Sequence, residues 1–220
     1  MSIYNSYNCG ILGFHTKRIA ENGFVGLGFT NAPASIAPLG GVKAVVGTNP
    51  FSIAVPYKGS ASIIIDQSAS VVAKSEISVR SKSGESIPEG WAFDAYGNTT
   101  TNAKEALKGT MAPSGGYKGF GFGLMAEILA SALTGSLSSV NAPPLKTTEG
   151  APHDLGQTYI LIDPNFNGEK DHFFKQLNNL TELISSQPNA RLPGSNKSNP
   201  LEAEIDKDLW DSVNKLADLS

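Results

Sequence analysis

The stretch of residues 111–136 constrains the fold of this chain most strongly. It opens with a glycine-rich turn at 114–119 and continues into an apolar segment. The apolar residues recur at spacings of three and four, which predicts a helix with a wide buried face, and Gly135 is placed to end it. Glycines let a ligand approach the backbone, free N–H groups at a helix start attract anions, and Lys118 adds a positive charge. The junction therefore predicts a seat for a phosphate-bearing cofactor. The alternative is a plain glycine-rich loop before a core helix, since the spacing is not that of a P-loop.

Charge and composition exclude several kinds of partner. The chain has 220 residues, a net charge of −3 and no basic run, which disfavours nucleic acid. It has one cysteine, so no internal disulfide can form, which suits a reducing cytoplasm. The N-terminus has no positive leader before an apolar run, and no uninterrupted apolar stretch reaches about 18 residues. We therefore expect a cytoplasmic protein that acts on a small molecule, with neither a nucleic-acid nor a membrane partner.

The remaining patterns predict short strands and helices in mixed order. Residues 5–10 are polar and turn-like. Helices are predicted at 11–21, 71–82, 102–108, 170–185 and 206–219, and strands at 24–30, 42–46, 51–56, 61–70 and 156–163. This mixture indicates an α/β or α+β domain. No GxGxxG lies between a first strand and a first helix, so a Rossmann domain is not supported.

A carboxylate and a hydroxyl lie at the end of the isoleucine-rich part of the strand predicted at 61–70, in the order Asp66, Gln67, Ser68. Polar side chains at the end of a strand are well placed to contact a ligand in an α/β protein. A ribose hydroxyl is a reasonable partner for Asp66. The alternative is that Asp66 caps the following helix, 71–82.

Histidines and the single cysteine give little sign of catalysis. His15 and His172 fall on predicted helix surfaces, where we expect them to be solvated, while His153 lies in a loop. Cys9 has no nearby histidine or helix start that would lower its pKa, so a nucleophilic role is disfavoured. No group of side chains has the spacing of metal ligands, so no metal is expected.

Taken together, the motifs resemble the malate/L-lactate dehydrogenase family of the non-Rossmann type, which includes sulfolactate and ureidoglycolate dehydrogenases and cyclic imino-acid reductases. Eleven groups of residues follow the order of the family over nearly the whole chain. They lie at 23–27 with Thr30 and Asn31, 38–41, 47–50, 66–70 with 72–74, 87–94, 100–101, 115–119, 133–135, 156–157, 163–164 and 191–194.

The resemblance implies an NAD(P)-dependent oxidoreductase that acts on 2-hydroxy or 2-oxo acids, or on cyclic imino acids. It implies an α/β (α+β) fold, L-sulfolactate dehydrogenase-like, with a mixed and largely antiparallel sheet flanked by helices, and a homodimer. We expect residues 1–185 to form the cofactor-binding domain and residues 186–220 to form a loop and helix that pack back on it. By resemblance, the residues that contact NAD or NADP are Asp66, Gln67, Ser68, Lys118, Arg191 and Gly194.

Two departures from the family fall in the acid/base half of the site. The family carries a Ser-His-Gly segment in an N-terminal stretch of roughly a hundred residues, and this sequence contains no such stretch. Asn8 stands where some members have a proton-accepting histidine, and an amide does not exchange a proton near neutral pH as imidazole does. The catalytic residues therefore stay unknown. We expect the cofactor-binding part of such a dehydrogenase, truncated or shortened. The alternative is a non-catalytic fragment that folds and dimerises, with or without dinucleotide binding.

Overall fold

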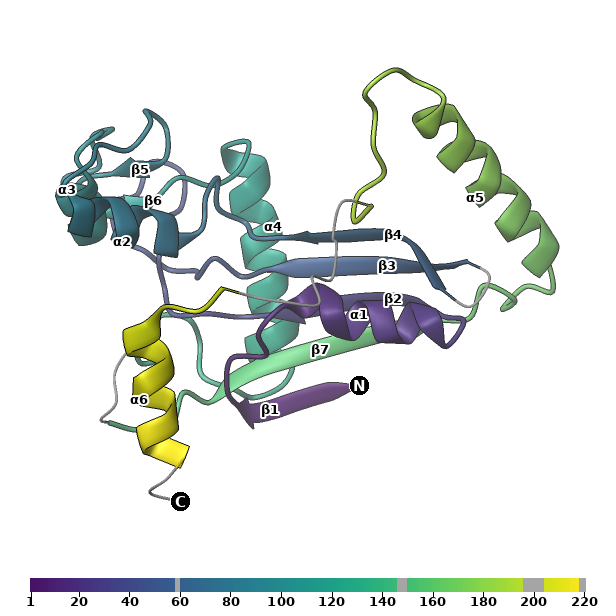
Figure 1. Ribbon diagram of the computed structural model, residues 1–220, viewed down its shortest axis with the longest axis horizontal. Coiled ribbons are helices and arrows are strands. Elements are labelled where there is room, and N and C mark those ends of the chain that lie inside the picture. The colour runs from purple at the N-terminus through teal and green to yellow at the C-terminus, as the bar shows by residue number, and fades with distance from the viewer. Residues whose placement is uncertain (58–59, 146–149, 196–203, 218–220) are drawn as a thin grey trace.

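The computed structural model describes residues 1–57, 60–145, 150–195 and 204–217, and Figure 1 shows its arrangement. A sheet lies between helices, and a smaller lobe lies at one end of it. The strands are β1 (Ser2–Ser6), β2 (Val25–Thr30), β3 (Phe51–Tyr57), β4 (Ser60–Gln67), β5 (Ala92–Phe93), β6 (Thr110–Met111) and β7 (Leu155–Ile162). The helices are α1 (Leu12–Glu21), α2 (Lys74–Ser83), α3 (Ala103–Lys108), α4 (Tyr117–Glu127), the π-helical turn η1 (Ile128–Ala132), α5 (Lys170–Ser185) and α6 (Lys207–Ala217).

The main sheet has the strand order β1-β7-β2-β3-β4, and every neighbouring pair is antiparallel. A separate two-stranded sheet pairs β5 with β6. The expectation of a mixed α/β fold with a largely antiparallel sheet flanked by helices is confirmed.

Helix α1 covers one face of the main sheet because the strand beneath it is rich in glycine. A Cβ atom at Gly26 would lie 2.8 Å from Cβ of Ile19, and one at Gly28 would lie 3.0 Å from Cγ2 of Thr16. The hydroxyls of Thr16 and Ser52 are 2.7 Å apart across this contact and both side chains are buried. Glycine in β2 therefore allows the helix to lie directly on the strands.

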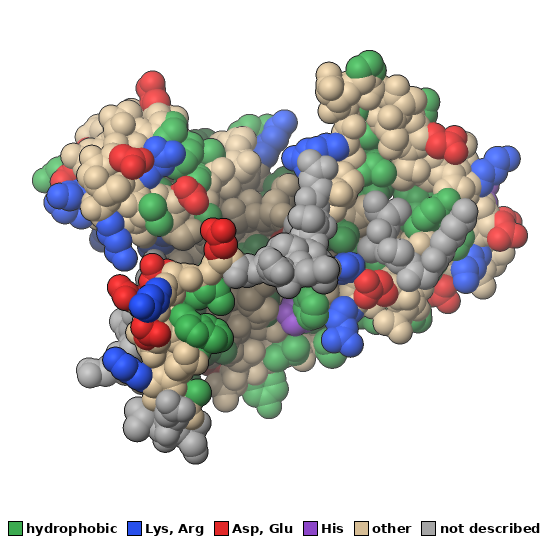
Figure 2. Space-filling model, viewed as in Figure 1, with side chains coloured by type: hydrophobic (Ala, Val, Ile, Leu, Met, Phe, Trp, Pro, Cys, Tyr) green, Lys and Arg blue, Asp and Glu red, His purple; other side chains and the backbone are tan. Residues whose placement is uncertain are grey.

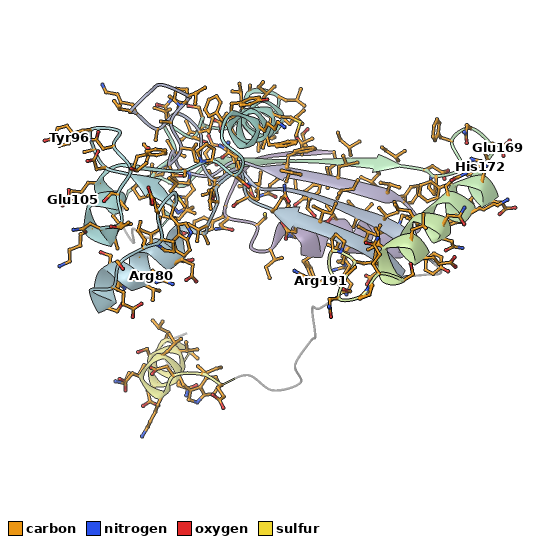
Figure 3. All side chains as sticks on the ribbon, turned by 90° about the horizontal axis from the view of Figure 1, so that it is seen from above. Arg80, Tyr96, Glu105, Glu169, His172 and Arg191 are labelled. Carbon is orange, nitrogen blue, oxygen red and sulfur yellow. The ribbon has the colours of Figure 1, made fainter. Side chains whose placement is uncertain are left out.

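Helix α4 and the turn η1 cover the opposite face, as the view from above shows (Figure 3). The contact with β7 is close, since a Cβ atom at Gly156 would lie 1.6 Å from the carbonyl oxygen of Ala130. Small residues line the inner side of this helix, namely Gly119, Gly123, Ala126 and Ala130, and all four are buried. The long apolar segment predicted from the sequence is thus a helix that packs through its small side chains.

The smaller lobe has its own hydrophobic core. Its buried members come from α2, α3, β5 and β6 and from the loops that follow β2, β4 and α2. The largest are Ile36, Val46, Ile77, Ile87 and Met111. Trp91 is half-buried against this core, and the guanidinium carbon of Arg80 lies 5.2 Å from the centre of its ring.

Within its described residues, the C-terminal segment is hydrogen-bonded to the edge of the sheet. The carbonyl oxygen of Pro193 accepts a hydrogen bond from the N–H of Ile64 in β4 (3.1 Å). Residues 204–217 are all exposed, and hydrophobic side chains are visible over α6 in Figure 2. The division into a domain at 1–185 and a segment 186–220 that packs back stays a prediction.

Two local predictions were wrong. Residues 42–46 form no strand, and only Val46 makes an isolated bridge, with Ile36. Residues 5 and 6, expected in a turn, belong to β1, which pairs with β7. Their polarity fits an edge strand, because one side of β1 has no strand neighbour in the described sheet.

Candidate functional site

The end of β4 is hydrogen-bonded to the start of α1. Oδ2 of Asp66 accepts the backbone N–H of Gly13 in the first turn of α1, at 2.8 Å. Ile11, which precedes that helix, provides no side-chain cap, so the carboxylate of Asp66 takes this role. The alternative that Asp66 caps the helix predicted at 71–82 is wrong, because Asp66 caps α1 and α2 has no side-chain cap. Among the described residues, Oδ1 of Asp66 has no partner, which leaves it able to accept a ligand hydroxyl.

The neighbours of Asp66 differ in exposure. Gln67 is exposed and ends β4, paired with Phe51 of β3. Ser68 is half-buried, and its hydroxyl donates to the carbonyl oxygen of Ser70 at 3.2 Å. Only the side chain of Gln67 is thus fully presented to solvent.

The glycine-rich turn lies against this segment. The N–H of Ser114 donates to the carbonyl oxygen of Ala69 at 2.8 Å, and Pro113 forms a bridge with Ser70. Gly115 and Gly116 have φ values of +70° and +66°, and a Cβ atom at either would meet only open space. These two positions need glycine for their backbone conformation, and they leave the turn open to an approaching molecule.

The start of α4 is suited to an anion. Helix α4 has no side-chain cap at its N-terminus and no acidic residue in its first turn. Lys118, in that first turn, is exposed. The free N–H groups, the helix dipole and the charge of Lys118 all favour a bound anion. The turn therefore fits the phosphate of a dinucleotide.

The third predicted contact lies along the outer edge of β4. Gly194 has a φ of +88°, and a Cβ atom there would lie 2.9 Å from Cβ of Ile64. Arg191 is exposed, and Figure 3 shows it on the loop beside the sheet. The six predicted residues thus lie on β4, on its continuation or on segments hydrogen-bonded to either. No hydrogen bond or ion pair joins Lys118 or Arg191 to Asp66 in the described structure.

A cavity of about 250 Å³ opens beside the glycine-rich turn. Its walls are mainly apolar and include Leu39, Phe93, Tyr117 and Phe120. Three of the recognised motifs line it, at 38–41, 87–94 and 115–119. Sequence reasoning noted these motifs separately but did not place them around one cavity.

The departure from the family at Asn8 has a local structural role. Oδ1 of Asn8 accepts the N–H of Gly10 at 2.7 Å, which stabilises the turn before α1. Nε2 of His15 lies 3.0 Å from the carbonyl oxygen of Cys9, so His15 is held half-buried where a solvated side chain was expected. His172 is exposed, as expected.

Buried titratable groups surround the same turn. Burial is the main cause that raises the pKa of the Cys9 thiol, and the nearby Asp66 charge adds to it. Burial also raises the pKa of Tyr159, which is 3% exposed. Both groups stay protonated near neutral pH, so Cys9 does not supply a thiolate nucleophile.

Two other features concern possible ligands. His153 is 4% exposed and its ring lies 4.3 Å from that of Tyr7, while its Nδ1 has no partner among the described residues. Within the described residues, no three His, Cys, Asp or Glu side chains are grouped closely enough to hold a metal ion.

None of the described helices is long and apolar enough to cross a bilayer.

Comparison with known proteins identifies the family to which this fold belongs. Residues 1–209 match the model of the malate/L-lactate dehydrogenase family, so the chain belongs to this family. A (2R)-3-sulfolactate dehydrogenase (NADP(+)) of Chromohalobacter salexigens is 36% identical over 90% of this chain and 59% of its own length. A Delta(1)-pyrroline-2-carboxylate reductase of Agrobacterium fabrum is 37% identical over 81% of this chain and 52% of its own length.

Solved structures show the same likeness. The sulfolactate dehydrogenase from Methanocaldococcus jannaschii superposes with a TM-score of 0.84 at 28% identity, over 99% of this chain and 65% of that one. A dehydrogenase from Sinorhizobium meliloti gives 0.83 at 30% identity, over 98% and 66%. The chain spans about three fifths of the length of the first curated relatives it matches.

Proposed function

We propose that the chain binds NAD or NADP and takes part in hydride transfer between the nicotinamide and a 2-hydroxy or 2-oxo acid, or a cyclic imino acid. The observation that carries this proposal is the hydrogen bond of Ser114 to Ala69. This bond sets the glycine-rich turn against the segment that follows β4, where the family resemblance expects the cofactor. The dehydrogenase and reductase names of the relatives support the reaction class. We also propose a homodimer, as the resemblance implies, and a cytoplasmic location, which the single cysteine suits.

Each predicted residue has a distinct role in this proposal. The free N–H groups of α4 and the ammonium of Lys118 hold a phosphate of the dinucleotide. Oδ1 of Asp66 accepts a ribose hydroxyl while Oδ2 stays bound to α1, and Gln67 and Ser68 provide further polar contacts. Arg191 contributes a second cation, and Gly194 allows its loop to approach β4. The dinucleotide would supply the hydride, and no residue of this chain is assigned as the proton donor.

The first prediction concerns Lys118. Replacing it in Lys118→Ala should weaken dinucleotide affinity about tenfold, the scale of one charge-assisted contact. Titration of the full chain with NADH and NADPH, followed by nucleotide fluorescence, measures this change and compares the two cofactors. Lys104→Ala, an exposed lysine at the start of α3, is the control and should bind as the unaltered chain does. An unchanged dissociation constant in Lys118→Ala would count against the placement.

Turnover is tested separately. The chain is assayed with malate, sulfolactate and pyrroline-2-carboxylate and both forms of each cofactor. Rates above background support the catalytic proposal. Dinucleotide binding without turnover supports the alternative of a non-catalytic binding protein.

A further inference from the structure

A second cavity, of about 430 Å³, lies on the other side of the segment that follows β4. Thr48 lines it, and the carbonyl oxygen of Thr48 accepts the N–H of Ala69 at 2.7 Å. None of the six residues predicted to bind the dinucleotide lines this cavity. It is therefore a separate space, and the function proposed above does not use it.

The N-terminus of α2 forms one wall. This ten-residue helix begins at Lys74 after Ala73, which provides no side-chain cap. Lys74 and Ser75 both line the cavity, and neither of their backbone N–H groups has a partner in the described structure. Lys74 forms no ion pair with any described residue. Uncapped N–H groups, the helix dipole and a free ammonium together favour an oxyanion.

Ser35, on the facing loop, gives an independent sign of a ligand. It is 4% exposed and lines the cavity, and its hydroxyl has no hydrogen-bond partner among the described residues. Its backbone is fully used, because its N–H donates to Val46 and its carbonyl oxygen accepts from Met111, each at 2.8 Å. A buried hydroxyl without a partner costs free energy, so this one is expected to be satisfied by a bound molecule.

Neighbouring carboxylates do not close the site to anions. Glu127 lies behind Ser139, and its Oε1 accepts the N–H of Ser139 at 2.7 Å. Its Oε2 accepts from the side-chain amide of Asn49 at 2.7 Å and from the hydroxyl of Ser139. Glu76, in the first turn of α2, is exposed and does not line the cavity. The charge of Glu127 is thus held by three donors on the far side of Ser139.

We propose that this cavity binds a small organic molecule through one oxyanion group, a phosphate, sulfonate or carboxylate, held by Lys74, the start of α2 and Ser35. The remaining walls are mainly apolar, with Pro33, Val140, Pro144 and Leu145 among them, and they accept the carbon skeleton. Thr48, Ser78 and Ser139 also line the cavity. The volume exceeds that of a bare inorganic anion.

The test follows backbone resonances of the ¹⁵N-labelled full chain by NMR. Sodium phosphate, added against sodium chloride at constant ionic strength, should shift the N–H signals of Ser35, Lys74 and Ser75. Lys74→Gln should weaken this binding about tenfold, and Ser35→Ala about fivefold. Lys82→Gln, an exposed lysine in the last turn of the same helix, is the control and should leave affinity unchanged.

Further ligands identify the source of the oxyanion. Methylphosphonate, propionate and propanesulfonate are titrated in the same way. If one of them binds more tightly than inorganic phosphate, the ligand of the cavity is a free organic acid. NADH that shifts the same signals, with affinity lost in Lys74→Gln, would assign it to a phosphate of the dinucleotide. The absence of any shift at these residues, or an equal response to chloride, overturns the proposal. If dinucleotide binding depends on Lys118 and not on Lys74, the function proposed above stands even when this cavity binds no oxyanion. Failure of the cavity proposal can therefore be distinguished from failure of the proposed function.

Discussion

At the scale of single residues, Asp66 shows how a structural and a binding role can share one side chain. One carboxylate oxygen holds the first turn of α1, and the other is open to a ligand. The sequence presented these roles as alternatives because it does not show which helix start lies next to the strand. A contact between residues 53 positions apart depends on the tertiary fold.

Two substitutions of Asp66 separate its roles. Asp66→Ala should lower the free energy of unfolding by about 1 kcal/mol, because the N–H of Gly13 loses its acceptor. Asp66→Asn keeps an acceptor oxygen, so its stability should stay near that of the unaltered chain while dinucleotide affinity falls through loss of the charge. Urea unfolding and NADH titration on both variants measure this. Equal free energies of unfolding for Asp66→Ala, Asp66→Asn and the unaltered chain would show that this cap does not contribute to stability.

Tyr159 predicts a loss of stability in alkali. Burial raises the pKa of its phenol above the ordinary value of 10.0. Because the folded state holds this proton more tightly than the unfolded state, its contribution is fully present below pH 10 and is lost as pH rises further. Denaturant unfolding between pH 8 and pH 11 should therefore show a steeper decline for the unaltered chain than for Tyr159→Phe. Tyr4→Phe, at a tyrosine that is 70% exposed, should follow the unaltered chain.

At the scale of elements, the glycines of α4 have opposite effects on stability. A Cβ atom at Gly119 would lie 2.2 Å from the carbonyl oxygen of Ser114, whereas one at Gly121 would meet nothing within 4 Å. The first glycine permits the turn to fold back on the helix. The second has no steric role, and it costs helix stability through backbone entropy.

This difference can be measured with a matched pair of variants. Gly119→Ala should destabilise the chain by several kcal/mol, because backbone atoms have to shift. Gly121→Ala should raise stability by up to about 1 kcal/mol. Thermal and urea unfolding of the two proteins give the comparison, and a loss of stability in Gly121→Ala would refute the assignment.

Sequence patterns predicted the elements whose own residues carry the signal. The helix at 170–185 was predicted with the bounds it has, and α1, α3, β2, β3 and β7 were predicted within a residue or two. The short strands β1, β5 and β6 were missed, since two to five residues do not carry a period and pairing with distant segments decides their conformation. The cavity at Ser35 could not be predicted either. Whether a buried hydroxyl has a hydrogen-bond partner depends on how distant segments pack around it.

At the scale of the whole molecule, α4 and η1 leave an apolar surface uncovered. The outward side chains Tyr117, Leu124, Met125 and Ile128 are between 37% and 66% exposed, and they share one side of the helix. Such a surface commonly marks an interface. The homodimer implied by the family resemblance would be one way to cover it.

A charge on this surface tests its part in association. Ile128→Glu should shift sedimentation of the full chain toward smaller species and leave unfolding by urea nearly unchanged, because Ile128 is 53% exposed. Val79→Glu, at an exposed valine of α2, provides the comparison and should leave sedimentation unaltered. If Ile128→Glu sediments as the unaltered chain does, this surface takes no part in self-association.

The hydrogen bond between Pro193 and Ile64 is expected to protect the chain from aggregation. It occupies the outer margin of β4, a strand whose open side could otherwise recruit an extended segment from another molecule. A protease cut between α5 and Pro193 would free the segment around Pro193 from the edge of β4. Nicked protein is then expected to polymerise through strand addition.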